Sequence, residues 1–299
     1  MNYSLKLTDL IYQEEDRERV AFHCSDYKKL AFDIFHSFKK TAKTNPPEWF
    51  ETLKWGAGKG VELAMLDILK QNGIVDKTYD QKLDGRIDFV REGVEIHGYM
   101  DAKVKSGNTL GLVENAPIEI KSINNANKFD IEKYINNNPR ENYVGQLAMY
   151  MDCLDMKIGY LFVASIDGLS RFSFICEKID EGIYKCGNTI VDLNKEYKRF
   201  SDLKTNYIDK NIEPNSSDEA IYKYDLSKLD FQKEFLEGRL FASQILKARN
   251  NEAVIGDWQV KYSDYKDLII KQQNTSLGYT DEEIKLIKEK TVGYTTWKK

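Results

Sequence analysis

Acidic and basic side chains in the first half of the chain have types and spacings that could bind a divalent cation and activate a water molecule. Asp101 ends the segment VEIHGYMD, and Glu119 and Lys121 lie in the segment PIEIKS. Successive side chains of a strand point to opposite faces, so Glu119 and Lys121 share one face while Ile118 and Ile120 share the other. Pairing of the two strands would bring Asp101 beside them. A solvated sheet face with a surface ion pair has the same pattern, so this spacing alone does not distinguish a cation site from an exposed face.

Glu62 supplies another carboxylate. It lies in a segment rich in helix formers and shares a helix face with Met65, Leu66 and Leu69. A carboxylate on an apolar face is costly to bury unless it is paired or binds a cation. The alternative is a glutamate at the edge of that face, with its carboxylate in water.

Gln146 and Tyr150 form a polar pair four residues apart on a later helix. Side chains at this spacing project together, so an amide and a phenol could both reach a phosphate. The alternative is an amphipathic helix whose polar boundary passes through these two positions.

Hydrophobic periodicity and turn residues predict the elements that position these side chains. The expected helices are residues 25–43, 58–71 and a segment that starts at Pro139 and continues through NYVGQLAMYMDCL, and the expected strands are 86–91, 94–104, 116–122, 158–165 and 171–177. The pattern after residue 177 is helical to about residue 208. A polar linker follows at 213–217, and the last 80 or so residues are helical again, with Thr280 and Glu283 as a capping box. This order predicts an α/β layer fold with a mixed sheet.

Length and charge exclude several classes of protein. The 299 residues are enough for one elaborated domain or two small ones, and the net charge of −4 argues against a protein that coats nucleic acid by bulk charge. No long apolar run or secretory signal is evident, so we expect no membrane span and a cytoplasmic location. Contact with nucleic acid would need a local basic groove, for which the nearby candidates are Lys103, Lys105, Lys128, Lys133, Arg140, Lys39, Lys40 and Lys43.

In their order along the chain, these pieces resemble the PD-(D/E)XK nuclease superfamily. The resemblance is to its RecB-like branch, which includes phage exonucleases and CRISPR-associated iron–sulfur nucleases. The matching segments, within roughly residues 55–165, are Gly58-x-x-x-Glu62, Gly98-Tyr-Met-Asp101, Glu119-Ile-Lys121 and Gln146-x-x-x-Tyr150. Met100 stands where the family has proline, and Glu62 stands where the branch often has histidine.

The resemblance implies a restriction-endonuclease-like core, with a mixed central sheet flanked by helices and with helical N- and C-terminal extensions. We therefore expect an N-terminal extension over residues 1–54, a nuclease core over 55–208, and a helical region over 209–299 that packs on the core.

The iron–sulfur members carry one cysteine near the N-terminus and three near the C-terminus in a C-x2-C-x5-C pattern. The corresponding positions here are Leu30, Val260, Ser263 and Ile269, so no cluster is expected. We expect the two terminal segments to pack together through apolar contacts instead.

The same resemblance implies a site for Mg²⁺ or Mn²⁺. Asp101 and Glu119 would be the main ligands, with the backbone carbonyl of Ile120 as a third. Glu62 would hold the same ion or help to bind a second one, and Asp88 is the reserve ligand. Hard divalent ions of this kind prefer carboxylate and carbonyl oxygen.

The remaining motif residues would act on the substrate. Lys121 would position the attacking water or stabilise the pentavalent phosphate. Gln146 and Tyr150 would orient the scissile phosphate or its neighbour.

The function implied is that of a metal-dependent DNA nuclease, more narrowly an exonuclease or end-processing enzyme of recombination, replication or repair, of the kind that phages encode. Its partners would be single-stranded DNA or duplex ends, together with recombination or replication proteins. A first alternative is a catalytically inactive protein on the same fold that binds DNA or another protein. A second is an unrelated hydrolase or structural protein, although no G-x-S-x-G, P-loop or H-E-x-x-H motif supports one.

Overall fold

The computed structural model describes residues 19–45, 49–124, 128–216, 222–223, 253–254 and 260–275. The chain divides into two compact units: the first combines Met1–Lys28 with Pro47–Lys204, and the second combines Lys29–Pro46 with Thr205–Lys299. Each unit thus joins segments that are far apart in the sequence, unlike the three consecutive segments expected above. The expected boundary after residue 54 falls inside a continuous helix, α3 (Trp49–Gln71).

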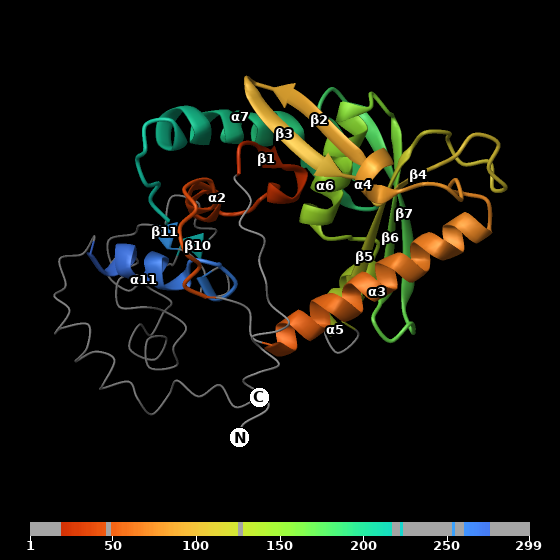
Figure 1. Cartoon of the computed structure of the whole chain (residues 1–299), viewed down its shortest axis with the longest axis horizontal. Helices are drawn as coiled ribbons and strands as arrows, with labels where there is room; N and C mark the ends of the chain where they lie inside the picture. Colours follow the sequence, from red (N-terminus) through yellow and green to blue (C-terminus); the bar gives the residue numbers. More distant parts are fainter. Residues whose placement is uncertain are drawn as a thin grey trace. The chain divides into compact units, whose positions relative to one another are not determined.

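The first unit is built on a six-stranded sheet (Figure 1). Its strand order is β4-β5-β6-β7-β8-β9, in which β5 and β6 are parallel and the other neighbours are antiparallel. These strands are β4 (Ala102–Lys103), β5 (Pro117–Ile123), β6 (Ile158–Ser165), β7 (Arg171–Asp180), β8 (Ile183–Cys186) and β9 (Thr189–Asp192). The sheet is mixed and flanked by helices, which confirms the predicted α/β class and is consistent with a restriction-endonuclease-like core.

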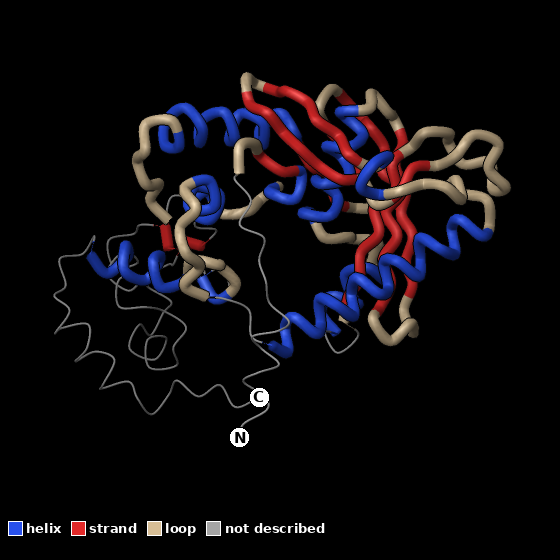
Figure 2. Tube along the Cα trace, viewed as in Figure 1, coloured by secondary structure: helices blue, strands red, loops and turns tan. Residues whose placement is uncertain are grey.

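A separate three-stranded sheet lies beside it in the same unit (Figure 2). Its order is β1-β3-β2, with β1 (Phe22–His23) parallel to β3 (Val94–Tyr99) and β2 (Arg86–Arg91) antiparallel to β3. The expected strand 94–104 is therefore wrong as one element. The chain leaves the small sheet after Tyr99 and joins the large one at Ala102, so the Asp101 position lies between the two sheets.

Helices cover both faces of the large sheet. In the first unit α3 packs on β5, and α6 (Glu141–Cys153) packs on β5 and β6 from the other side (Figure 1). The remaining helical segments of this unit are α4 (Gln81–Asp84), α5 (Lys128–Ile135), α7 (Leu193–Leu203) and the short 3-10 helix η1 (Cys24–Asp26). The π-helical turn η2 (Lys204–Ile208) follows α7, and from Thr205 on it belongs to the second unit.

The close approach of α3 to β5 depends on Gly58. A Cβ atom at that position would lie 2.5 Å from Oγ of Ser122, so only a residue without a side chain fits there as the structure stands. Ile118 and Ile120 are fully buried in the cluster on this face, together with Leu69 of α3. Because side chains alternate, Glu119 and Lys121 point toward the opposite face, where α6 lies.

The expected helical run after residue 177 is wrong. β7 continues to Asp180, and the hairpin β8–β9 comes before α7. Gly182 and Gly187 have φ values of 69° and 57°, which an ordinary L-residue rarely adopts, and they turn the chain at the ends of β8. Within these short strands buried Tyr184 and Cys186 alternate with exposed Lys185, which is the period of a strand.

The expected helix 25–43 is also shorter in the structure. The second unit contains α2 (Ala31–Phe38), while Cys24–Asp26 forms only η1 of the first unit. Lys28 and Lys40 have φ values of 59° and 52°, outside the helical region, so neither continues a helix.

The second unit confirms the apolar packing of the two terminal segments. Its core cluster contains three residues from the positions aligned with cysteines, Leu30, Val260 and Ile269, together with Phe32 and Tyr265. Ser263, the fourth aligned position, is buried and donates a hydrogen bond from Oγ to Oδ1 of Asp33 at 2.6 Å. The other described elements of this unit are α11 (Lys266–Thr275) and the antiparallel pair β10 (Tyr222–Lys223) and β11 (Ala253–Val254).

The last 80 or so residues are expected from the sequence to be helical, and the two short strands β10 and β11 differ from that expectation. The predicted Thr280–Glu283 capping box lies outside the described residues. In the described part of the chain, no helix combines the length and the apolar character that a membrane crossing requires.

Candidate functional site

Asp101 lies at an open edge of β5. Strand β4 is two residues long and pairs with Ile118 and Pro117, so the described sheet has no strand beside β5 at Glu119 and beyond. The backbone N–H of Ile120 points to this edge and donates to Oδ2 of Asp101 at 2.8 Å. The N–H and C=O of one strand residue point to the same side, so the carbonyl oxygen of Ile120 faces the same edge.

Glu119 and Lys121 form an ion pair beneath α6. The Glu119 side chain is fully buried, the Lys121 side chain is 20% exposed, and Nζ of Lys121 contacts Oε1 of Glu119. Beyond this contact with the Lys121 ammonium, neither carboxylate oxygen of Glu119 has a hydrogen-bond partner among the described residues. The alternative of a solvated sheet face is therefore wrong for Glu119, because the helices on both sides of the sheet remove this position from water.

Burial and mutual repulsion act on the acidic groups. Burial raises the pKa of Glu119 well above its ordinary value, the charge of Asp101 adds to this rise, and Lys121 opposes it. Burial likewise raises the pKa of Asp101 against the opposing charge of Lys121. For Lys121, burial would lower the pKa, but the charges of Glu119 and Asp101 outweigh it and raise the pKa, so the ammonium stays protonated.

Glu62 approaches the same place from α3. Its carboxylate pairs with Lys59, with 3.1 Å between Lys59 Nζ and Glu62 Oε2, and its side chain is 22% exposed. The charge of Glu62 contributes to the raised pKa values of both Asp101 and Glu119, after the larger effect of burial. Four of the side chains singled out in the sequence thus influence one another electrostatically, although they come from α3, the β3–β4 junction and β5.

Gln81, at the start of α4, was not singled out in the sequence. Its amide Nε2 donates to Oδ1 of Asp101 at 2.6 Å, and its Oε1 lies 3.4 Å from Nζ of Lys59. Gln81 and Lys59 therefore connect the Asp101 carboxylate to the Glu62 carboxylate. No local pattern marks Gln81, because it meets Asp101 only through the path of the chain between the two sheets.

The predicted pair on α6 is together in the structure. Nε2 of Gln146 lies 2.6 Å from the Tyr150 hydroxyl, and that hydroxyl donates to the carbonyl of Tyr99 at 3.0 Å. Burial raises the pKa of Tyr150 well above its ordinary value, with a further contribution from Glu119, so the phenol stays neutral. Tyr143, one turn before Gln146, has its ring centre 5.6 Å from Nζ of Lys121.

Asp88 lies apart from this group, on β2 of the small sheet. It pairs with Nε of Arg86 at 2.8 Å and lies 3.6 Å from Nε2 of His97. The structure thus gives Asp88 basic neighbours of its own, and it does not join the other acidic residues.

The donor set suits a hard divalent cation in its chemistry. Carboxylate and carbonyl oxygens converge on one edge, and within the described part of the chain the buried Glu119 carboxylate has no hydrogen-bond donor besides the Lys121 ammonium. Those described residues nevertheless contain no group of three or more histidine, cysteine, aspartate or glutamate side chains close enough to hold an ion. Asp101 and Glu62 are turned toward Gln81 and Lys59, so joint coordination requires these side chains to change rotamer.

Comparison with known proteins yields distant structural similarity alone. No known protein family and no curated protein matches the sequence. Among solved structures, the protein SSO0001 is 15% identical with a TM-score of 0.39, over 67% of this chain and 83% of that one. An alkaline exonuclease from Laribacter hongkongensis is 14% identical with a TM-score of 0.36, over 64% of this chain and 90% of that one. At these scores neither similarity carries an argument about what this chain does.

Proposed function

We propose that the chain is a metal-dependent nuclease that hydrolyses phosphodiester bonds of DNA. The observation that carries the proposal is the meeting of a buried carboxylate, Glu119, with the charged amine of Lys121 and the carboxylate of Asp101 at the open edge of β5. Burying such charges costs stability unless they are fully paired, and in the described region Glu119 has no hydrogen-bond donor besides the Lys121 ammonium. A role for these charged groups in cation binding and phosphate hydrolysis would explain why they are buried despite that cost.

The proposed cation is Mg²⁺ or Mn²⁺, held by Asp101, Glu119 and Glu62 with the carbonyl of Ile120. When bound, such an ion lowers the pKa of a coordinated water and neutralises charge that develops on the phosphate. Asp88 is not included, because the structure gives it other partners.

The other side chains act directly on the substrate in this proposal. Lys121 stays protonated, so its ammonium donates to the attacking water or to a non-bridging phosphate oxygen. Gln146 and Tyr150 orient the phosphate in this proposal, which requires their amide and hydroxyl to exchange the bonds they make to each other and to the Tyr99 carbonyl for bonds to the phosphate. The water oxygen bonds to phosphorus and its proton passes to solvent, while the bond from phosphorus to one bridging oxygen breaks and that oxygen takes up a proton to become the hydroxyl end of the product.

Digestion of DNA tests this function directly. Purified protein is incubated with end-labelled linear DNA and with circular DNA, in Mn²⁺, in Mg²⁺ and in EDTA. We expect loss of linear DNA that requires the metal, and resistance of the circle if the enzyme is an exonuclease. Glu119→Gln and Lys121→Met should each lower the rate by about 100-fold or more, since each removes a charge that stabilises the transition state.

The matched control is Glu177→Gln, an exposed glutamate on β7, which should cleave as the unmodified protein does. Circular dichroism checks that each variant is folded. If neither metal supports cleavage of single-stranded or duplex DNA by the folded protein, the nuclease proposal is wrong.

A non-catalytic binding module on the same fold is the second candidate. It is favoured by one observation: within the described residues, the acidic side chains do not gather into a metal-binding group. A stable DNA complex without cleavage in the same assay would support it. For either candidate we propose a cytoplasmic protein with DNA as its partner; for the nuclease, the more specific proposal is an end-processing enzyme in recombination, replication or repair that works with the proteins of those processes.

A further inference from the structure

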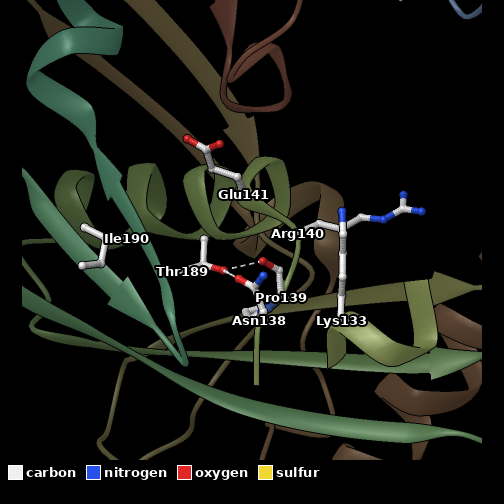
Figure 3. A pocket seen from close by; sticks show the side chains of 7 residues that line it. All are labelled: Lys133, Asn138, Pro139, Arg140, Glu141, Thr189 and Ile190. Atoms are coloured by element: carbon white, nitrogen blue, oxygen red, sulfur yellow. Dashed lines mark hydrogen bonds between the residues drawn. The ribbon is translucent and has the colours of Figure 1, made fainter. Parts of the chain in front are cut away.

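A polar hollow of about 310 Å³ opens at the start of α6 in the first unit (Figure 3). The residues that line it come from α5, the α5–α6 connection, the first turn of α6 and β9, and they are Lys133, Asn138, Pro139, Arg140, Glu141, Thr189 and Ile190. This hollow contains none of the residues assigned above to the cation or to the phosphate. Its lining must therefore be explained separately.

The charge in the hollow is mainly positive. Lys133 and Arg140 both line it, and Figure 3 shows them on the side away from Thr189 and Ile190. The one acidic residue of the lining, Glu141, is engaged elsewhere. Its Oε1 lies 3.7 Å from Nζ of Lys28 and accepts a hydrogen bond from the Tyr27 hydroxyl at 3.3 Å. In Figure 3 the Glu141 carboxylate points away from Asn138 and Thr189.

Neutral donors accompany these cations. The Thr189 hydroxyl lies 2.6 Å from the carbonyl of Pro139 and 2.8 Å from Oδ1 of Asn138, and its single proton can be donated to only one of these oxygens. Donation to Asn138 leaves the amide NH₂ of that side chain for a ligand. Asn188 donates from its backbone and from its side chain to the carbonyls of Asn137 and Asn136, so the connection is tied to the β8–β9 turn. At the start of α6, the Arg140 side chain makes no capping bond. The first-turn N–H groups of a helix lack partners inside it and favour an anion.

Tyr143 connects the hollow to the proposed active site. Its ring centre lies 5.6 Å from Nζ of Lys121 and 5.5 Å from Cζ of Arg140. The same guanidinium lies 3.2 Å from the Tyr143 hydroxyl through Nη1. The two cations thus contact one aromatic ring from β5 and from the start of α6, which places the hollow next to Lys121.

We propose that this hollow binds a neighbouring phosphodiester phosphate of the strand that is cut at Lys121. The inference rests on the proposed nuclease function and adds a substrate-binding subsite to it. Lys133 and Arg140 supply the charge, Asn138 and the start of α6 supply neutral donors, and Tyr143 sets the spacing from the scissile phosphate. A phosphate fits better than a carboxylate, because its several acceptor oxygens can use donors that surround it.

The test measures binding of a short fluorescent single-stranded oligonucleotide as a function of salt. Both proteins carry Lys121→Met to prevent cleavage, and one also carries Lys133→Ala and Arg140→Ala. Each phosphate contact on a single strand contributes about 0.7 to the slope of log affinity against log salt. We expect the hollow variant to lose about that much slope and to bind about 10-fold more weakly. In the cleaving background, KM should rise about as much while kcat changes little.

Two controls make the result specific. Lys157→Ala removes an exposed lysine before β6 and should leave the slope unchanged. On the substrate side, a single neutral methylphosphonate is moved along the strand. At one position near the cleavage point, the methylphosphonate should weaken binding to the Lys121→Met protein. At the same position it should not weaken binding to the variant that also carries Lys133→Ala and Arg140→Ala.

The outcomes separate this subsite from the function on which it rests. If the unmodified protein cleaves DNA but the Lys133 and Arg140 variant keeps the same salt slope, KM and methylphosphonate profile, the subsite is wrong and the nuclease remains. If the unmodified protein neither binds nor cleaves DNA, both proposals are wrong.

Discussion

Glu119 is the residue on which the site depends most. It is a fully buried carboxylate whose identified partner is the ammonium of Lys121, while the nearby Asp101 raises its pKa further. Removing one member of a buried ion pair leaves an uncompensated charge, which costs about 3–5 kcal/mol. An apolar residue would stabilise the core more at this position, which is why the proposed function gives Glu119 a chemical role.

Gln81 provides a prediction at the residue scale, which rests on the proposed cation. Gln81→Ala removes the hydrogen bond that holds Oδ1 of Asp101, so the carboxylate is less well oriented. Residues that orient a metal ligand contribute about 10- to 100-fold to metal affinity. We therefore expect Mn²⁺ to bind this variant about 10-fold or more weakly, measured by isothermal titration calorimetry without DNA. Lys82→Ala, an exposed neighbour on α4, is the control. Equal affinity of the Gln81→Ala variant and the unmodified protein would contradict this role.

At the scale of elements, the interruption between β3 and β4 is the feature that leaves the edge of β5 uncovered beside Asp101. One continuous strand would have extended along β5 and covered its edge. Because the chain changes sheets between Tyr99 and Ala102, the N–H of Ile120 remains available to Asp101. The same junction brings the Tyr99 carbonyl to the hydroxyl of Tyr150 on α6.

Gly98, at the end of β3, provides a prediction at this scale. A Cβ atom there would lie 2.8 Å from Sγ of Cys24 and 2.9 Å from Cε1 of Tyr150, both in the interior. Overpacking of this kind costs about 1–3 kcal/mol, so Gly98→Ala should lower the free energy of unfolding by that amount in urea titration. It should also reduce DNA cleavage, since Tyr150 must move.

Gly60→Ala is the matched comparison. No atom lies within 4 Å of a Cβ atom at this position on α3, so the substitution should raise the free energy of unfolding by about 0.5–1 kcal/mol through the helix backbone. The packing argument would be refuted if the two alanine variants had the same stability.

At the scale of the whole molecule, each compact unit joins distant parts of the chain. In the second unit, Leu30 and Phe32 pack with Val260, Tyr265 and Ile269 across more than two hundred residues of sequence. Such contacts are lost together when the unit opens, because neither segment buries its apolar face alone.

Ile269 provides the prediction for this scale. Ile269→Ala removes a fully buried side chain from the cluster and should cost about 2–5 kcal/mol. Hydrogen exchange should then show faster exchange in both α2 and α11, although the substitution lies in only one of them. Lys271→Ala, at an exposed position of α11, should leave exchange unchanged. Faster exchange restricted to α11 would show that the two segments do not stabilise each other.

Hydrophobic periodicity and turn residues in the sequence predicted many of the helices and strands of the first unit. The expected strands 86–91 and 158–165 agree with β2 and β6 residue for residue, because clear turn residues such as Glu92-Gly93 and Asp167-Gly168 bound them. The hairpin β8–β9 was missed because each strand has only four residues and is interrupted by lysine or bounded by polar turns. Gln81 was missed because a hydrogen bond over twenty residues leaves no local signal.

The amino-acid sequence by itself determined that Glu119 and Lys121 lie side by side on one strand and that Gln146 and Tyr150 share a helix face, because these relations depend only on backbone period. Only the tertiary structure decided that Glu119 is buried, that Asp101 meets the free edge of β5, and that Lys133 and Arg140 line one hollow. Burial and charge coupling depend on which elements cover a residue, and in this chain those elements come from α3, α6 and the junction between two sheets.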